Sequence, residues 1–74
     1  MKLSQKWIDL GWEKDDGYTF EAFSKKFPDK TLHLVSKTPS GKWWMANVYK
    51  NNTPFATATS SHKTLSKALK SFYP

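Results

Sequence analysis

Residues able to do acid–base or metal chemistry are few in this chain and widely spaced. Its two histidines, His33 and His62, stand 29 positions apart, and cysteine is absent. Asp15 and Asp16 are adjacent and precede Gly17, which is typical of a turn whose carboxylates bond to their own backbone. The sequence contains no glycine-rich phosphate-binding motif and no histidine spacing of a metal site. We therefore expect no catalytic residue, no metal ligand and no cofactor.

Lysine is the residue type that indicates a binding function. The 74 residues include 12 lysines, no arginine and 6 acids, for a net charge of +6. All six acids lie in residues 1–29, whereas seven lysines and no acid follow from Lys30 onward. Such a surface attracts polyanions, so a nucleic acid, an anionic membrane surface or an acidic protein is the expected partner class. The lack of arginine disfavours sequence-specific base contacts, because the bidentate guanidinium fork is missing.

The composition predicts one small domain over residues 1–74, made of a mixed-charge aromatic segment (1–29) and a basic sheet-plus-helix region (30–74). Twelve aromatic residues, four of them Trp, supply a large apolar area for so short a chain. No apolar run resembles a signal sequence or a membrane span. We expect no membrane insertion, no small-molecule substrate and, because cysteine is absent, a cytoplasmic location.

An antiparallel hairpin is the clearest structural prediction. Residues 31–37 and 42–50 are rich in Leu, Val, Trp and Tyr, and they flank the turn Pro39-Ser40-Gly41. Pro54 cannot donate to a strand ladder, so residues 55–59 are expected to form a third strand that begins just after it.

Residues 63–72 are predicted to form a helix that packs on one face of the sheet. Its apolar residues recur at i, i+3, i+4 and i+7, and lysines occupy the other faces. Ser60 or Ser61 is the expected N-cap. The apolar positions are Leu65, Ala68, Leu69 and Phe72.

The first third of the chain allows two interpretations at two places. Ile8, Leu10 and Trp12 alternate as in a strand, but Leu3, Trp7 and Leu10 also fit a short helix capped by Ser4. Residues 19–25 fit a strand, although phenylalanines spaced along this region also fit a helix ending before Pro28. We expect helix then strand at the first place and strand at the second. The predicted fold is α+β, an antiparallel three- to four-stranded meander with a C-terminal amphipathic helix packed on one face.

Alternation along residues 42–50 separates an inner from an outer set of side chains. Ala46 and Val48 are small enough to let the helix approach, so their side is expected to be the inner one. The outer set is Trp43, Met45, Asn47 and Tyr49, and we expect Lys37 and His33 of the neighbouring strand beside it. Aromatic side chains among lysines suit nucleic acid, since bases stack on rings and ammonium groups neutralise phosphates. Whether the aromatic residues of segment 1–29 cover the same face is left open.

The stretch Gly41-Lys42-Trp43-Trp44-Met45-Ala46-Asn47-Val48-Tyr49-Lys50, with the strand and helix after it, resembles AP2-like DNA-binding domains over residues 31–74. This resemblance implies a three-stranded sheet backed by a helix and inserted in the DNA major groove. By residue types and by the resemblance together, the expected nucleic-acid-binding residues are Lys37, Lys42, Trp43, Met45, Asn47, Tyr49, Lys50 and Thr57.

The sequence is therefore consistent with two functions. The first is a small non-enzymatic nucleic-acid-binding protein, with DNA favoured over RNA. The alternative is a phage or mobile-element protein that docks on an acidic host protein through the aromatic residues and modulates it.

Overall fold

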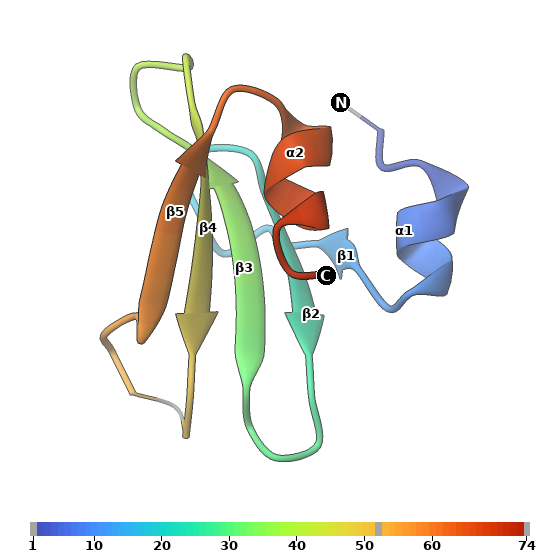
Figure 1. Ribbon diagram of the computed structural model, residues 1–74, viewed down its shortest axis with the longest axis vertical. Helices are drawn as coiled ribbons and strands as arrows, with labels where there is room; N and C mark the ends of the chain where they lie inside the picture. Colours follow the sequence, from blue (N-terminus) through green and yellow to red (C-terminus); the bar gives the residue numbers. More distant parts are fainter. Residues whose placement is uncertain (1, 52, 74) are drawn as a thin grey trace.

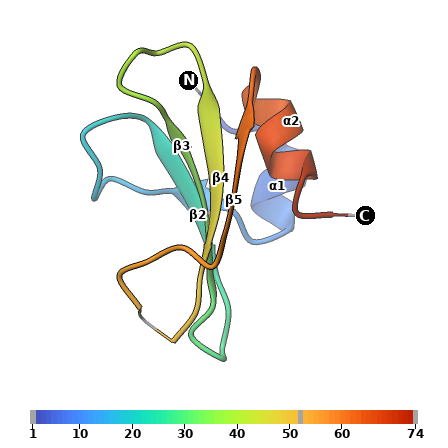
Figure 2. The same cartoon turned by 60° about the vertical axis from the view of Figure 1, so that its left-hand side comes forward.

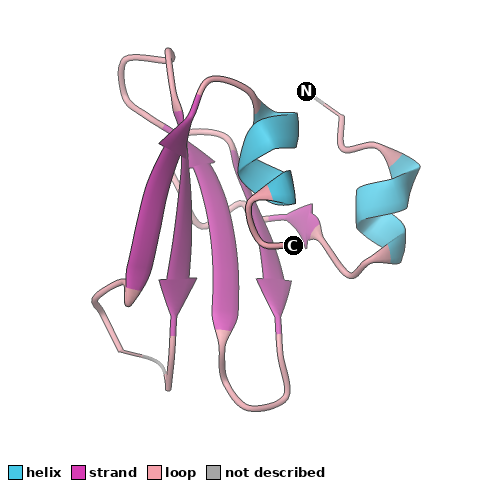
Figure 3. Ribbon diagram, viewed as in Figure 1, coloured by secondary structure: helices cyan, strands magenta, loops and turns pink. Residues whose placement is uncertain are grey.

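The computed structural model describes residues 2–51 and 53–73, which form an antiparallel sheet with two short helices (Figures 1 and 3). The elements in chain order are α1 (Gln5–Asp9), β1 (Glu13–Lys14), β2 (Ala22–Lys26), β3 (Leu32–Lys37), β4 (Trp44–Tyr49), β5 (Ala58–His62) and α2 (Leu65–Lys70). The strands are ordered β1-β2-β3-β4-β5, each antiparallel to the next. The α+β meander is thus confirmed. The sheet has five strands and not three or four, because short β1 also pairs with β2.

The N-terminal segment forms a helix and then a strand, as predicted. Ser4 has extended backbone angles before α1, and Trp7 is the residue of α1 that is buried. The helix ends at Asp9, and Gly11 adopts a φ of 103°, a left-handed value that glycine tolerates best. After this turn the chain enters β1. The strand expected over residues 19–25 is present in part: β2 begins only at Ala22 and continues to Lys26.

Register divides the sheet into two faces. Phe23, Val35 and Ala46 are aligned across β2, β3 and β4. Their side carries α1 and α2, and we call it the helix face (Figure 2). Leu34 of β3 is aligned with Asn47 of β4, and each is the sequence neighbour of an inward residue. Both therefore point to the opposite side, which we call the outer face.

The hydrophobic core lies between the helix face and the two helices. Trp12 is 2% exposed and its Nε1 donates a hydrogen bond to Tyr73 Oη at 2.8 Å. This bond links the segment after α1 to the C-terminal segment after α2. Trp44 and Ala46 point inward, as alternation predicted. The buried cluster consists of Leu3, Trp7, Trp12, Phe23, Val35, Trp44, Ala46, Ala68 and Leu69.

A connector, residues 15–21, crosses the outer face between β1 and β2 (Figure 2). Ala22, Ser24 and Leu34 are almost fully buried on this face. Tyr18 and Phe20 of the connector stay partly exposed, at 45% and 43%. The aromatic residues of segment 1–29 therefore divide between the two faces. Trp7, Trp12 and Phe23 pack in the core on the helix face, whereas Tyr18 and Phe20 lie over the β2–β3 side of the outer face. The β4–β5 side is less covered.

Strand β5 begins later than the predicted range 55–59. Phe55 is 79% exposed in the preceding loop. The backbone N–H of Thr57 donates to the Val48 carbonyl at 2.7 Å, and regular pairing starts with Ala58 opposite Val48. The chain needs these extra residues to reverse direction before it meets the register of β4.

Helix α2 is shorter than the predicted range 63–72 and has a different cap. Ser60 and Ser61 pair with β4, so neither can serve as the N-cap. The cap is Thr64, whose Oγ1 accepts a hydrogen bond from the Lys67 backbone N–H at 3.1 Å. The apolar side of the helix nevertheless packs into the core as expected.

Candidate nucleic-acid interface

An aromatic and polar strip runs along the outer face of β4. Because Trp44 points into the core, strand alternation turns Met45, Asn47 and Tyr49 outward. Trp43 lies in the same line just before the strand and is 41% exposed. We call Trp43, Met45, Asn47 and Tyr49 the β4 strip. It is the outer set that the sequence predicted.

Hydroxyl side chains of β5 border the strip. Thr59 lies opposite Asn47, and its Oγ1 donates to Asn47 Oδ1 at 2.5 Å. Ser61 lies opposite Met45, and its Oγ donates to the Met45 sulfur at 3.1 Å. With its oxygen engaged in this way, Asn47 presents its amide nitrogen as a hydrogen-bond donor.

The connector borders the other side of the strip and leaves an open hollow at each end. The hollow of about 470 Å³, which we call the tyrosine hollow, is lined by Tyr18, Lys30, Leu32, Tyr49, Thr53 and Pro54. The hollow of about 310 Å³ is lined by Tyr18, Thr19, Phe20, Ser36, Lys37, Thr38, Pro39 and Met45. Tyr18 therefore stands between two recesses that both open onto β4.

Charge is distributed unevenly around the strip. Exposed Lys42 precedes Trp43 at one end, and exposed Lys50 follows Tyr49 at the other. On the connector side, partial burial, Asp15 and the nearby Tyr49 raise the pKa of Tyr18. An anion is thus attracted toward the ends of β4 and repelled from the connector.

Two residues expected beside the strip are on the other face, so this part of the prediction is wrong. Lys37 is aligned with Trp44, and its Nζ lies 5.5 Å from the centre of the Trp44 ring and 3.8 Å from Glu21 Oε1. His33 is aligned with Val48 and stacks on Phe72. The register pairs outward residues of β4 with even-numbered residues of β3, which puts both predicted neighbours on the helix face.

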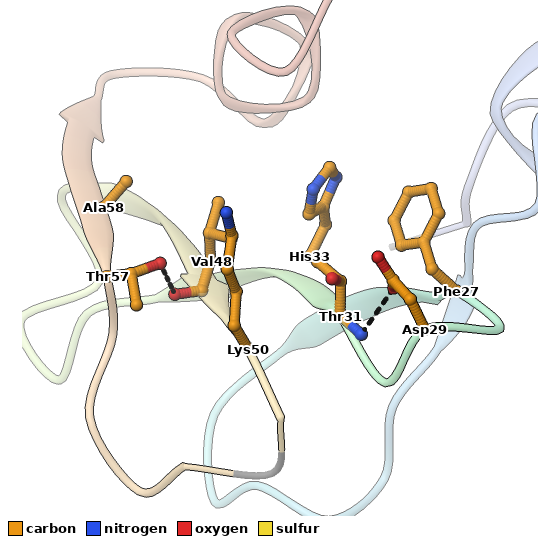
Figure 4. A pocket seen from close by; sticks show the side chains of 8 residues that line it. All are labelled: Phe27, Asp29, Thr31, His33, Val48, Lys50, Thr57 and Ala58. Atoms are coloured by element: carbon orange, nitrogen blue, oxygen red, sulfur yellow. Dashed lines mark hydrogen bonds between the residues drawn. The ribbon is translucent and has the colours of Figure 1, made fainter.

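Thr57 is also separated from the strip. Its Oγ1 donates to the Val48 carbonyl at 3.1 Å, and it lines a hollow beyond the end of α2 (Figure 4). We call this the His33 hollow; its volume is about 570 Å³. Lys50 lines it too, beside Val48, so its side chain lies on the helix side at this end of the sheet. The full lining is Phe27, Asp29, Thr31, His33, Val48, Lys50, Thr57 and Ala58.

No family model, curated protein or solved structure matches this chain. Over residues 2–51 and 53–73, no group of three or more His, Asp or Glu side chains comes together as a metal site. In the same part of the chain, neither helix is long and apolar enough to cross a membrane.

The His33 hollow has mixed electrostatics. Burial and the nearby Lys25 lower the pKa of His33, and Asp29 partly offsets them. Hydrogen bonds from Thr31 lower the pKa of Asp29, and Lys50 acts in the same direction. The Asp29 carboxylate therefore opposes the binding of an anion in this hollow, although Lys50 lines it too.

Sequence reasoning missed four residues at the interface. Tyr18 and Lys30 line the tyrosine hollow, and Thr59 and Ser61 border the strip. Tyr18 follows the Asp15–Gly17 turn without any periodic pattern that would fix its side. Only the register of β5, which depends on the length of its loop, brings the two hydroxyls opposite β4.

Proposed function

We propose that this chain is a non-enzymatic nucleic-acid-binding protein, with DNA favoured over RNA. Lys42 and Lys50 neutralise phosphates, while Trp43 and Tyr49 stack on bases or sugars. The observation that carries the proposal is the β4 strip itself. It is an aromatic row on a side of the sheet that neither helix of the described residues covers, and an exposed lysine adjoins it in the sequence at each end.

Charge separation in the fold supports the same function. The six acids belong to α1, β1, the connector and the β2–β3 turn, whereas β3, β4, β5 and α2 contain no acid. A polyanion that lies along β4 and β5 therefore avoids most of the repulsion that it would meet over β1 and β2.

The AP2-like resemblance is compatible with part of this arrangement, because β3, β4 and β5 are consecutive antiparallel strands backed by α2. In an AP2-like mode the β4 strip would face the DNA. Lys37 and Thr57 would lie outside the contact, the first on the helix face and the second in the His33 hollow.

Titration with duplex DNA, single-stranded DNA and RNA of matched sequence, followed by tryptophan fluorescence at about 50 and 200 mM salt, tests the proposal. We expect binding that weakens at the higher salt and is reduced by Trp43→Ala. Because Trp43 lies outside the core cluster, this variant should keep its fold. Lys67→Ala on α2 is the control and should bind as the unchanged protein does. Absence of binding to all three nucleic acids at low salt would overturn the proposal.

A second candidate function, docking on an acidic protein, is favoured by the free edge of β5. Strand β5 pairs with β4 on one side and ends the sheet on the other (Figure 1). Its residues are mostly exposed, and no Lys, Asp, Glu or Pro occurs from Phe55 to Ser61. Natural edge strands commonly use such residues to prevent further pairing. An extended acidic segment of a partner could therefore add to this edge.

Amide hydrogen exchange in the presence of an extended Glu-rich peptide tests this second function. Slower exchange within residues 58–62, which persists at about 200 mM salt, would support strand addition. Unchanged exchange in this range at saturating peptide would exclude it. Nucleic-acid binding should instead depend steeply on salt, so the two functions are separable.

A further inference from the structure

The tyrosine hollow has the lining of a site for a flat aromatic ligand. Tyr18 reaches it from the connector and Tyr49 from the end of β4, while Pro54 comes from the β4–β5 loop. Leu32, aligned with Tyr49 on the outer face, supplies the sheet surface beneath. Elements far apart in the sequence thus bring two phenol rings and two apolar residues to one recess.

Lys30 lies at this recess in a turn closed by hydrogen bonds. Its backbone adopts a φ of 70°, and its N–H donates to the Phe27 carbonyl at 3.1 Å. The same turn is closed by the Phe27 N–H to the Thr31 carbonyl and by the Thr31 N–H to Asp29 Oδ1. A left-handed conformation at a non-glycine residue persists only where surrounding contacts maintain it. The turn therefore fixes the backbone position from which the Lys30 side chain lines the hollow.

The charges around the hollow select which part of a nucleotide enters it. Asp15 lies close enough to Tyr18 to interact with it electrostatically, so a phosphate inside the hollow would be repelled. Lys30, the lysine of the lining, attracts a phosphate at the rim of the hollow. An uncharged ring inside and a backbone phosphate outside satisfy both conditions.

We propose that the tyrosine hollow receives one unpaired base of a single-stranded nucleic acid, with the adjoining phosphate on Lys30. This inference rests on the proposed function and makes it more specific. A base within a duplex is stacked and paired on both sides, so it cannot leave the helix to enter a recess without the cost of unstacking. Single strands present bases that stack on aromatic side chains at no such cost. The preferred ligand is therefore single-stranded.

Competition between a single-stranded oligonucleotide and its own duplex tests the inference, with Tyr18→Leu and Tyr49→Leu as variants and Tyr49→Phe as the control that keeps the ring. We expect tighter binding of the single strand. Each Leu variant should weaken it about 5- to 150-fold, the factor that corresponds to one stacked base. Tyr49→Phe should retain most of the affinity. Thermal unfolding of each variant checks that the fold is kept.

A second measurement is independent of any substitution in the protein. Scanning a single abasic site along a short oligonucleotide should reduce the affinity most at one position, because one base is seated in the hollow. Equal affinity for single strand and duplex, with unchanged binding by both Leu variants, would overturn the inference and leave the proposed function standing. Absence of binding to every nucleic acid would overturn both.

Discussion

At the scale of single residues, His33 is enclosed by aromatic rings. It stacks on Phe72 with ring centroids 4.5 Å apart and planes 16° apart, and Phe27 lies 4.6 Å away on a tilted plane. Burial and Lys25 lower the pKa of His33, with a smaller opposing effect of Asp29. The folded protein therefore binds a proton at this residue less readily than the unfolded chain does.

His33 should make the folded protein more stable as the pH rises through the region at and below its ordinary pKa of 6.5. In that window the unfolded state binds more protons, so the free energy of unfolding increases with pH. Urea unfolding between about pH 5 and 7.5 measures the effect. His33→Phe keeps an aromatic ring against Phe72 and should flatten the curve, whereas His62→Phe should not. A curve with the same slope in all three proteins would contradict this explanation.

Ser24 is a buried hydroxyl beneath the connector. It is 1% exposed, and within the described part of the chain its Oγ has no hydrogen-bond partner. An unpaired buried hydroxyl costs free energy that an alanine avoids. Ser24→Ala should therefore leave the free energy of unfolding unchanged or raise it by up to about 1 kcal/mol. Urea unfolding measures this, and a clear loss of stability relative to a Ser36→Ala control would contradict it.

At the scale of elements, the N-cap of α2 contributes to the attachment of this helix. The helix has six residues, too few to be stable in isolation, so its cap and its buried side maintain it together. Thr64→Ala removes the Oγ1 acceptor and should cost about 1 kcal/mol. The unfolding temperature should fall by about 4–8 °C for a domain of this size. Thr64→Ser keeps the acceptor and should stay close to the unchanged protein; an equal fall in both variants would refute the role of the cap.

Local patterns in the sequence were sufficient for the element types and for the side of β4. The two-residue alternation of side chains along β4 predicted Trp44 and Ala46 inward and Trp43 outward. This works because alternate residues of a strand point to the same face, so burial of one face recurs at every second residue. The period of the C-terminal helix likewise predicted Ala68 and Leu69 in the core. These features depend on residues close together in the chain.

Features that depend on loop length and long-range contact could not be predicted in this way. Lys37 and His33 were assigned to the wrong face because the register across residues 38–43 is set by the turn and not by either strand alone. The start of β5 at Ala58 depends on how the preceding loop reverses. The position of Tyr18 depends on the path of the connector across the sheet, which no local pattern determines.

At the scale of the whole molecule, the excess positive charge belongs to one part of the fold. Residues 1–29 carry all six acids and five lysines, whereas the seven lysines from Lys30 onward lie in or next to β3 to β5 and α2. The net charge of +6 is therefore concentrated over one part of the surface. Within that part, Lys42 and Lys50 adjoin the two ends of β4 in the sequence, whereas Lys67 and Lys70 belong to α2.

This separation allows local phosphate contacts to be distinguished from general attraction. Each phosphate that a lysine neutralises changes the slope of log affinity against log salt by about 0.7 for a single strand and about 0.9 for a duplex. The double variant Lys42→Ala/Lys50→Ala should therefore reduce the slope by about 1.4 with single-stranded DNA.

Lys67→Ala/Lys70→Ala lowers the net charge by the same amount and is the matched control. Because these lysines belong to α2 and do not adjoin the β4 strip, the control should weaken binding only slightly and leave the slope nearly unchanged. Equal slopes for the two double variants would mean that the protein attracts nucleic acid through its overall charge. The β4 strip would then no longer be the site of contact.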